Sequence, residues 1–122
     1  MITVYHYPRC GTCRTALRWL EAQGIRAELV DIVEHPPPRE LLARIVEQGT
    51  PVKKLFNTSG ELYRKGNYKE RLATMSLDEA LDELAAHGKL IKRPLVVGQG
   101  RGGADVTLVG FDEARYAEKL GG

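Results

Sequence analysis

The sequence predicts a mixed α/β fold, and three successive stretches of the chain carry that prediction. Residues 1–33 have the pattern of a strand, a helix and a second strand. Residues 34–92 are mainly helical in pattern, and residues 95–120 contain two short β-rich runs followed by a helix. Strands separated by helices, with no internal repeat, are typical of one packed α/β fold.

The opening of the chain predicts a βαβ unit. A run of β-branched and aromatic residues predicts the first strand over Ile2–Tyr7, and Pro8 ends it. From Thr12 to Gly24, apolar residues recur at helical spacing, which predicts an amphipathic helix. A second strand is expected over Glu28–Val33. Because a helix links the two strands, they should be parallel with a right-handed crossover.

The middle of the chain is predicted to be helical, with one stretch that has no clear period. Pro36–Pro38 break the chain, and the apolar spacing of Leu41–Val46 then predicts a helix. Within residues 50–74, Val52, Leu55 and Phe56 suggest a short helix, and segments 57–60 and 65–67 resemble turns. Ser76 and Glu79 have the spacing of a capping box, so a further helix should begin there.

The end of the chain predicts a hairpin and a helix. Leu95–Val97 and Val106–Val109 are two short β-rich runs, and the glycine-rich segment Gly98–Asp105 joins them. Asp112–Leu120 carries apolar residues at helical spacing and is expected to form the closing helix.

Composition excludes several classes of function. The chain has 122 residues, with 18 Lys+Arg against 16 Asp+Glu and a formal charge of +2, so direct nucleic-acid binding is not expected. No segment approaches the ~20 apolar residues of a membrane span, and the start lacks the pattern of a signal peptide. We therefore expect a cytoplasmic protein that does not bind membranes. Two closely spaced cysteines indicate redox or metal chemistry rather than a secreted disulfide framework.

The cysteines lie in the stretch HYPRCGTCR, where the first strand meets the helix. A helix N-terminus favours a thiolate at Cys10, and Cys13 is one helical turn further on, close enough to form a disulfide with it. Two structural thiols and a zinc site are the alternatives. Zinc needs about four ligands, and beyond Cys10, Cys13 and His6 the sequence offers no second cluster. We therefore expect redox chemistry and no metal.

The same loop has the features of an anion site. His6, Cys10 and Arg14 form the pattern His-x3-Cys-x3-Arg. Backbone amides at a helix N-terminus, including those of Gly11 and Thr12, can hold an oxyanion or a carboxylate. His6 also shares a face with the apolar residues of its strand, so a buried structural histidine is the alternative to a functional one.

Taken together, these segments resemble the glutaredoxin-linked arsenate reductases and their Spx-like relatives. The resemblance covers nearly the whole chain, through YHYPRCGTCR, PPPRELL, LFNTSGELYRK, SLDEAL, LIKRPLVV and LVGF. It implies a thioredoxin-like fold with a mixed four-stranded sheet. It also implies a single domain over residues 1–122, with an inserted helical region at about 34–92.

The resemblance also implies roles for individual residues. Cys10 matches the reactive cysteine, and His6 and Arg14 match the residues that flank it in the anion-binding pattern. Arg93 matches one of the arginines that hold the oxyanion. Pro94 matches the cis-proline that precedes a strand of the sheet.

Three positions depart from the reductase pattern. Asn57, a candidate for anion binding, and Gly110 stand where the resemblance places two further arginines. Cys13 stands where reductases that rely on external thiols usually have serine. The resulting CxxC motif is similar to that of Spx-like regulators and of some reductase-like members.

The function expected from the sequence is that of an arsenate-reductase-like thiol-disulfide oxidoreductase. Cys10 would be the nucleophile and Cys13 the resolving thiol, with Arg14 and Arg93 as electrostatic partners. The substrate would be a disulfide or an oxyanion, with glutathione or another thiol as co-substrate, glutaredoxin or thioredoxin as partner, and no metal or organic cofactor. The alternative is an Spx-like redox-sensing transcriptional regulator that binds RNA polymerase. The retained pattern of His6, Cys10 and Arg14 favours the oxidoreductase, because a sensor does not need an anion site.

Overall fold

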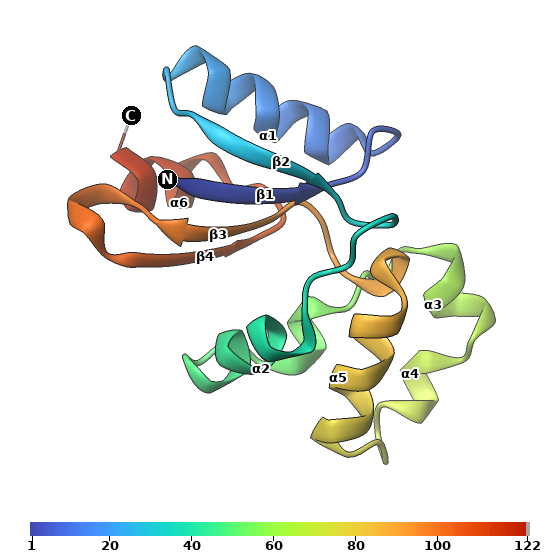
Figure 1. The fold of residues 1–122 in the computed structure, drawn as a ribbon. Helices are drawn as coiled ribbons and strands as arrows, with labels where there is room; N and C mark the ends of the chain where they lie inside the picture. The colour runs from blue at the N-terminus through green and yellow to red at the C-terminus, as the bar shows by residue number, and fades with distance from the viewer. Residues whose placement is uncertain (122) are drawn as a thin grey trace. The chain divides into compact units, whose positions relative to one another are not determined.

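The computed structural model describes residues 1–121, and the chain divides into two compact units (Figure 1). The first unit joins Met1–Asp31 to Arg93–Gly122, and the second is Ile32–Lys92. The inserted region was expected at about 34–92, close to the bounds of the second unit. That both units belong to a single domain stays a prediction.

The first unit is built on a four-stranded mixed sheet, which confirms the predicted fold class (Figure 1). Its strands are β1 (Ile2–His6), β2 (Ala27–Asp31), β3 (Leu95–Gln99) and β4 (Asp105–Val109), in the order β2-β1-β3-β4. β1 and β2 are parallel, whereas β3 is antiparallel to both β1 and β4. The parallel pair is the one that the βαβ pattern predicts.

Helices α1 (Gly11–Ala22) and α6 (Glu113–Tyr116) supply side chains to the core on one face of this sheet. Alternate strand residues point to the same face, so Ile2 and Val4 of β1 are buried together. The core cluster consists of Ile2, Val4, Ala16, Leu20, Val96, Val106, Leu108 and Tyr116. The buried positions of α1 include Cys13, so its apolar face fixes which side of the helix carries this cysteine.

The strands and helices of the first unit lie near their expected positions, and two of them differ most from the sequence-based expectation. The second strand was expected over Glu28–Val33 but ends at Asp31, which pairs with His6 at the end of β1. Because Pro8 lacks an amide proton and the chain turns into the cysteine loop, residues after Asp31 have no neighbouring strand. The closing helix, expected over Asp112–Leu120, is one α-helical turn at α6 followed by a π-helical segment, Ala117–Gly121.

The second unit is helical. Its helices are α2 (Arg39–Glu47), α3 (Glu61–Lys65), α4 (Tyr68–Arg71) and α5 (Leu77–Ala86), with 3-10 segments at Val52–Leu55 and Gly88–Leu90. α2 packs against α5, and Arg39 forms ion pairs with Asp78 and Asp82 of α5 at 3.0 and 2.6 Å. Among residues 1–121, no helix is long and apolar enough to cross a membrane.

Candidate active site

Cys10 is the N-cap residue of α1. Its backbone amide donates to the Tyr7 carbonyl at 3.0 Å, and its carbonyl accepts from the Arg14 amide at 3.1 Å. Its Sγ atom accepts a hydrogen bond from the Cys13 amide at 3.4 Å. The loop thus places the Cys10 sulfur beside unpaired amides of the first helical turn, where negative charge is stabilised.

The surroundings of Cys10 favour its thiolate. Burial opposes ionisation, because the side chain is partly shielded from solvent. Hydrogen bonds from the side chain and amide of Cys13, the charge of Arg93 and the amide of Thr12 outweigh burial and lower the pKa of Cys10 below its usual value. Cys10 is therefore both accessible and activated, as a nucleophilic cysteine must be.

Cys13 has the opposite character. Its side chain is fully buried on the core side of α1, and no disulfide joins it to Cys10. Burial, together with the hydrogen bond to Cys10 and the charge there, raises the pKa of Cys13 to about 12, although the Tyr7 amide and Arg93 favour ionisation. Cys13 therefore keeps its proton at neutral pH and donates it to the Cys10 sulfur in a hydrogen bond.

Arg93 and Pro94 immediately precede β3, and the charge of Arg93 acts on both cysteines. The Arg93–Pro94 peptide bond is cis, as the resemblance implies. Tyr5 of β1 pairs with Leu95 of β3, and Tyr7 and Arg93 each lie two residues beyond this last pair of the two strands. The Arg93 guanidinium carbon lies 5.1 Å from the centre of the Tyr7 ring. The sheet register thus brings a positive charge to a loop that is distant in sequence.

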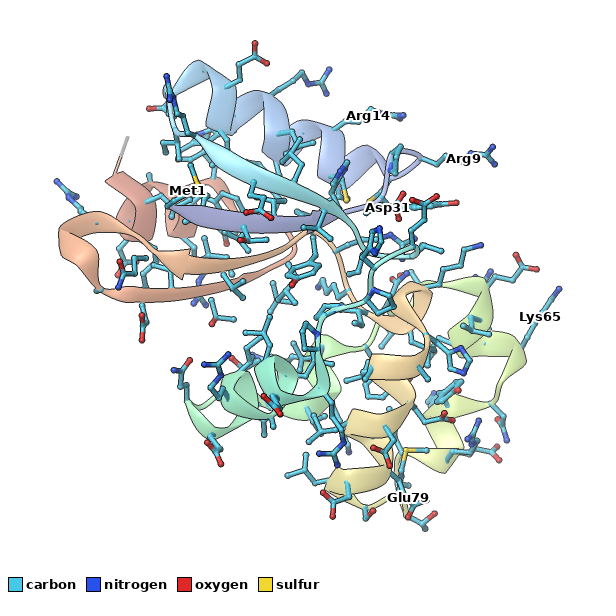
Figure 2. The ribbon with its side chains drawn as sticks, viewed as in Figure 1. Met1, Arg9, Arg14, Asp31, Lys65 and Glu79 are labelled. Atoms are coloured by element: carbon cyan, nitrogen blue, oxygen red, sulfur yellow. The ribbon has the colours of Figure 1, made fainter. Side chains whose placement is uncertain are left out.

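The remaining candidates of the loop lie around Cys10. Figure 2 shows Arg14 extending outward at the start of α1 and Arg9 extending from the loop before it. Arg14 is exposed, and its Nη1 donates to the Pro8 carbonyl at 3.5 Å. His6 is partly buried at the end of β1. A side chain at Gly11 would meet open space, so the region beside the Cys10 backbone is accessible.

The two positions that lack an arginine have different surroundings. Asn57 belongs to the second unit, where its amide donates to the Leu90 carbonyl at 2.6 Å. Gly110 belongs to the first unit and has a φ of 77°, a conformation that disfavours side chains. Its amide donates to the Pro94 carbonyl at 2.9 Å, and its carbonyl accepts from the Tyr116 hydroxyl at 2.7 Å. Gly110 thus has a structural role, because it hydrogen-bonds both the cis-proline and Tyr116.

Sequence reasoning missed one residue of this site, Tyr7. Its ring contacts Arg93, its carbonyl binds the Cys10 amide, and its amide hydrogen-bonds Cys13. The register between β1 and β3 was the signal that could have identified it. Within residues 1–121, no group of three or more His, Cys, Asp or Glu residues is arranged to hold a metal ion.

A thioredoxin-like sheet with a close pair of cysteines at the start of its first helix defines the class of thiol-based redox proteins. The ArsC family model matches residues 5–119, and the chain belongs to the ArsC family. It is 48% identical over 118 residues to the uncharacterized protein YusI of Bacillus subtilis, covering 96% of each chain. It is 37% identical over 97 residues to an arsenate reductase of Escherichia coli, covering 79% of this chain and 67% of the relative.

A solved structure supports the same assignment. The crystal structure of an ArsC family related protein from Bacteroides fragilis matches with a TM-score of 0.87 and 38% identity, covering 96% of this chain and 95% of that one. The fold, the sequence family and the activated cysteine therefore agree on thiol redox chemistry.

Proposed function

We propose that this protein is a thiol-disulfide oxidoreductase in which Cys10 is the nucleophile and Cys13 the resolving thiol. The observation that carries the proposal is the asymmetry of the pair. Cys10 is accessible with a lowered pKa, whereas Cys13 is buried with a pKa of about 12, and the two lie within one helical turn. A dithiol enzyme needs this asymmetry, because one thiolate must attack the substrate disulfide and the other thiol must react only after the mixed disulfide has formed.

In the first step, the Cys10 thiolate attacks one sulfur of the substrate disulfide. The substrate S–S bond breaks, one substrate thiolate leaves and takes up a proton from solvent, and a mixed disulfide forms between Cys10 and the remaining half. Arg93 stabilises the attacking thiolate before this step.

In the second step, Cys13 loses its proton to solvent and its thiolate attacks the Cys10 sulfur. The second half of the substrate leaves as a thiolate, and a Cys10–Cys13 disulfide remains, so two electrons have passed to the substrate. Once Cys10 is in a mixed disulfide it carries no charge, which removes one cause of the high pKa of Cys13. Burial of Cys13 persists, so we expect this step to be slower than the first at neutral pH.

Two equivalents of glutathione or another thiol would restore the dithiol and be oxidised to a disulfide. Alternatively, glutaredoxin or thioredoxin would supply the two electrons from its own dithiol. The proposal includes no metal or organic cofactor. The first unit offers Arg93 and the amides of Gly11 and Thr12 as groups for an anionic substrate, with His6 and Arg14 beside them.

The test is turnover of a model disulfide with dithiothreitol as reductant. We expect the wild type to accelerate the reaction, Cys10→Ser to abolish the acceleration and Cys13→Ser to reduce it. Wild-type rates in Cys10→Ser would contradict the proposal. A protein that is inert in this assay and is retained by RNA polymerase would instead support the regulator.

A further inference from the structure

Tyr7 contacts both cysteines and Arg93 in the cysteine site. Its carbonyl accepts from the Cys10 amide at 3.0 Å, and its amide hydrogen-bonds the Cys13 sulfur. Its ring lies under the Arg93 guanidinium, with 5.1 Å between the guanidinium carbon and the ring centre. The backbone contacts need no particular side chain, whereas the contact with Arg93 requires an aromatic ring.

The ring contact matters because an arginine side chain has many rotamers. Contacts restrict these rotamers, and the ring of Tyr7 is one of the contacts of the Arg93 guanidinium. The negative face of an aromatic ring attracts a guanidinium within about 6 Å of its centre. The distance to Tyr7 is within this range.

From these contacts we infer that Tyr7 is a positioning residue, whose ring holds the Arg93 guanidinium beside the two cysteine sulfurs. Tyr7 acts through Arg93 and does not itself react. Without the ring, the Arg93 guanidinium loses one of the contacts that position it, and the sulfur of Cys10 receives less positive charge on average. The inference deepens the proposed function and rests on it, since it takes Cys10 as the reacting thiol.

The experiment measures the rate of iodoacetamide alkylation at Cys10, resolved by peptide mass spectrometry, between pH 5 and 9. The proteins are the wild type, Tyr7→Leu, Tyr7→Phe, Arg93→Gln and the double variant Tyr7→Leu/Arg93→Gln. Tyr7→Phe is the matched control, because it keeps the ring. If Tyr7→Leu does not fold, Tyr7→Met is the variant without a ring.

We expect Tyr7→Leu to slow alkylation at pH 7 by about three- to tenfold, because less Cys10 is ionised. Tyr7→Phe should remain within about twofold of the wild type, since phenylalanine also binds cations. The double variant should match Arg93→Gln alone, because the ring acts only through Arg93.

Three results would overturn the inference: a wild-type profile in Tyr7→Leu, an equal loss in Tyr7→Phe, or a double variant slower than Arg93→Gln. The readout is independent of turnover. If Cys10→Ser abolishes disulfide reduction while Tyr7→Leu keeps the wild-type profile, only this inference fails. If Cys10→Ser leaves turnover intact, the proposed function fails whatever the alkylation profile.

Discussion

At the scale of single residues, the site depends on two cysteines that differ in burial. Cys10 precedes α1 and is partly exposed, whereas Cys13 faces the core from within the helix. Three residues along a helix are nearly one turn, so the sulfurs can approach each other while their environments differ. Under the proposed function, one short motif would thus supply both the attacking and the resolving thiol.

The first prediction concerns the order of reaction. With iodoacetamide under reducing conditions, Cys10 should be alkylated well before Cys13 at every pH from 5 to 9, because its pKa is lowered and its sulfur is accessible. Peptide mass spectrometry at successive times gives the two rates. Equal rates for the two cysteines would show that the assignment is wrong.

The second prediction concerns stability at high pH. In the unfolded chain Cys13 ionises near its ordinary pKa of about 8.5, whereas in the folded chain its pKa is about 12. The contribution of Cys13 to stability is thus complete below pH 8.5 and decreases as the pH rises towards 12. Each pH unit in this window costs about 1.4 kcal/mol, or about 2 kcal/mol by pH 10.

Urea unfolding of the reduced protein at pH 8, 9 and 10 measures this loss. Cys13→Ala is the matched control, because it keeps the other titrating groups. The variant should be less sensitive to pH than the wild type, whatever its stability at pH 8. The same decline in both proteins would exclude Cys13 as its source.

At the scale of elements, the start of a helix is fixed by the hydrogen bonds of its N-cap residue. Ser76 caps α5: the Glu79 amide donates to its hydroxyl oxygen at 3.1 Å, and the hydroxyl donates to the Glu79 carboxylate at 3.1 Å. The first of these contacts satisfies the Glu79 amide, which the helix itself cannot pair. The sequence spacing alone predicted this start.

The third prediction is that Ser76→Ala lowers the free energy of unfolding by about 1 kcal/mol, because the Glu79 amide loses its side-chain acceptor. Ser76→Asp is the control, since aspartate also accepts from this amide. Chemical denaturation compares the three proteins. A cap without energetic value would leave Ser76→Ala as stable as the wild type.

The strong periodic elements could be predicted from the sequence, because each follows from local spacing and end signals. The strand at Ile2, the helix after Cys10 and the cap at Ser76 are of this kind. The short helix at Val52–Leu55 was suggested by its apolar residues, but α3 and α4 could not be predicted, because such short helices are stabilised by contacts distant in sequence, such as that of Phe56 with Tyr68, whose ring centres are 6.0 Å apart. The end of β2 depended on where its partner strand stops.

The candidate site also has one part that could be predicted from the sequence and one part that could not. Cys10 and Cys13 follow from the motif and its position at a helix start. The contact of Tyr7 with Arg93 depends on the pairing of β1 with β3, which local patterns do not contain. Such residues become visible only when the sheet register is known.

At the scale of the whole molecule, the chain has the ArsC fold, and the resemblance implies an altered set of anion-binding groups. By the resemblance, reductases carry arginines at the positions of Asn57 and Gly110. Arginine donates paired hydrogen bonds to an oxyanion, which asparagine and glycine cannot do. The left-handed conformation of Gly110 and its contacts with Pro94 and Tyr116 give this position a structural role instead.

The fourth prediction is that arsenate reduction is weak or absent. Each lost charge-assisted hydrogen bond costs roughly 1.5 to 3 kcal/mol, so two would weaken oxyanion binding by about two to four powers of ten. A coupled assay with glutathione and glutaredoxin measures arsenate turnover. Robust turnover by the wild type would overturn this prediction.

The central claim is that Cys10 attacks the substrate and Cys13 resolves the intermediate, and trapping that intermediate tests it most directly. Wild type, Cys13→Ser and Cys10→Ser are each mixed with a small disulfide, quenched with acid and analysed by intact mass and peptide mapping. We predict a mixed disulfide on Cys10 that accumulates in Cys13→Ser, a Cys10–Cys13 disulfide in the wild type, and no rapid adduct in Cys10→Ser. A rapid adduct on Cys13, or equal accumulation in the wild type and Cys13→Ser, would contradict the account.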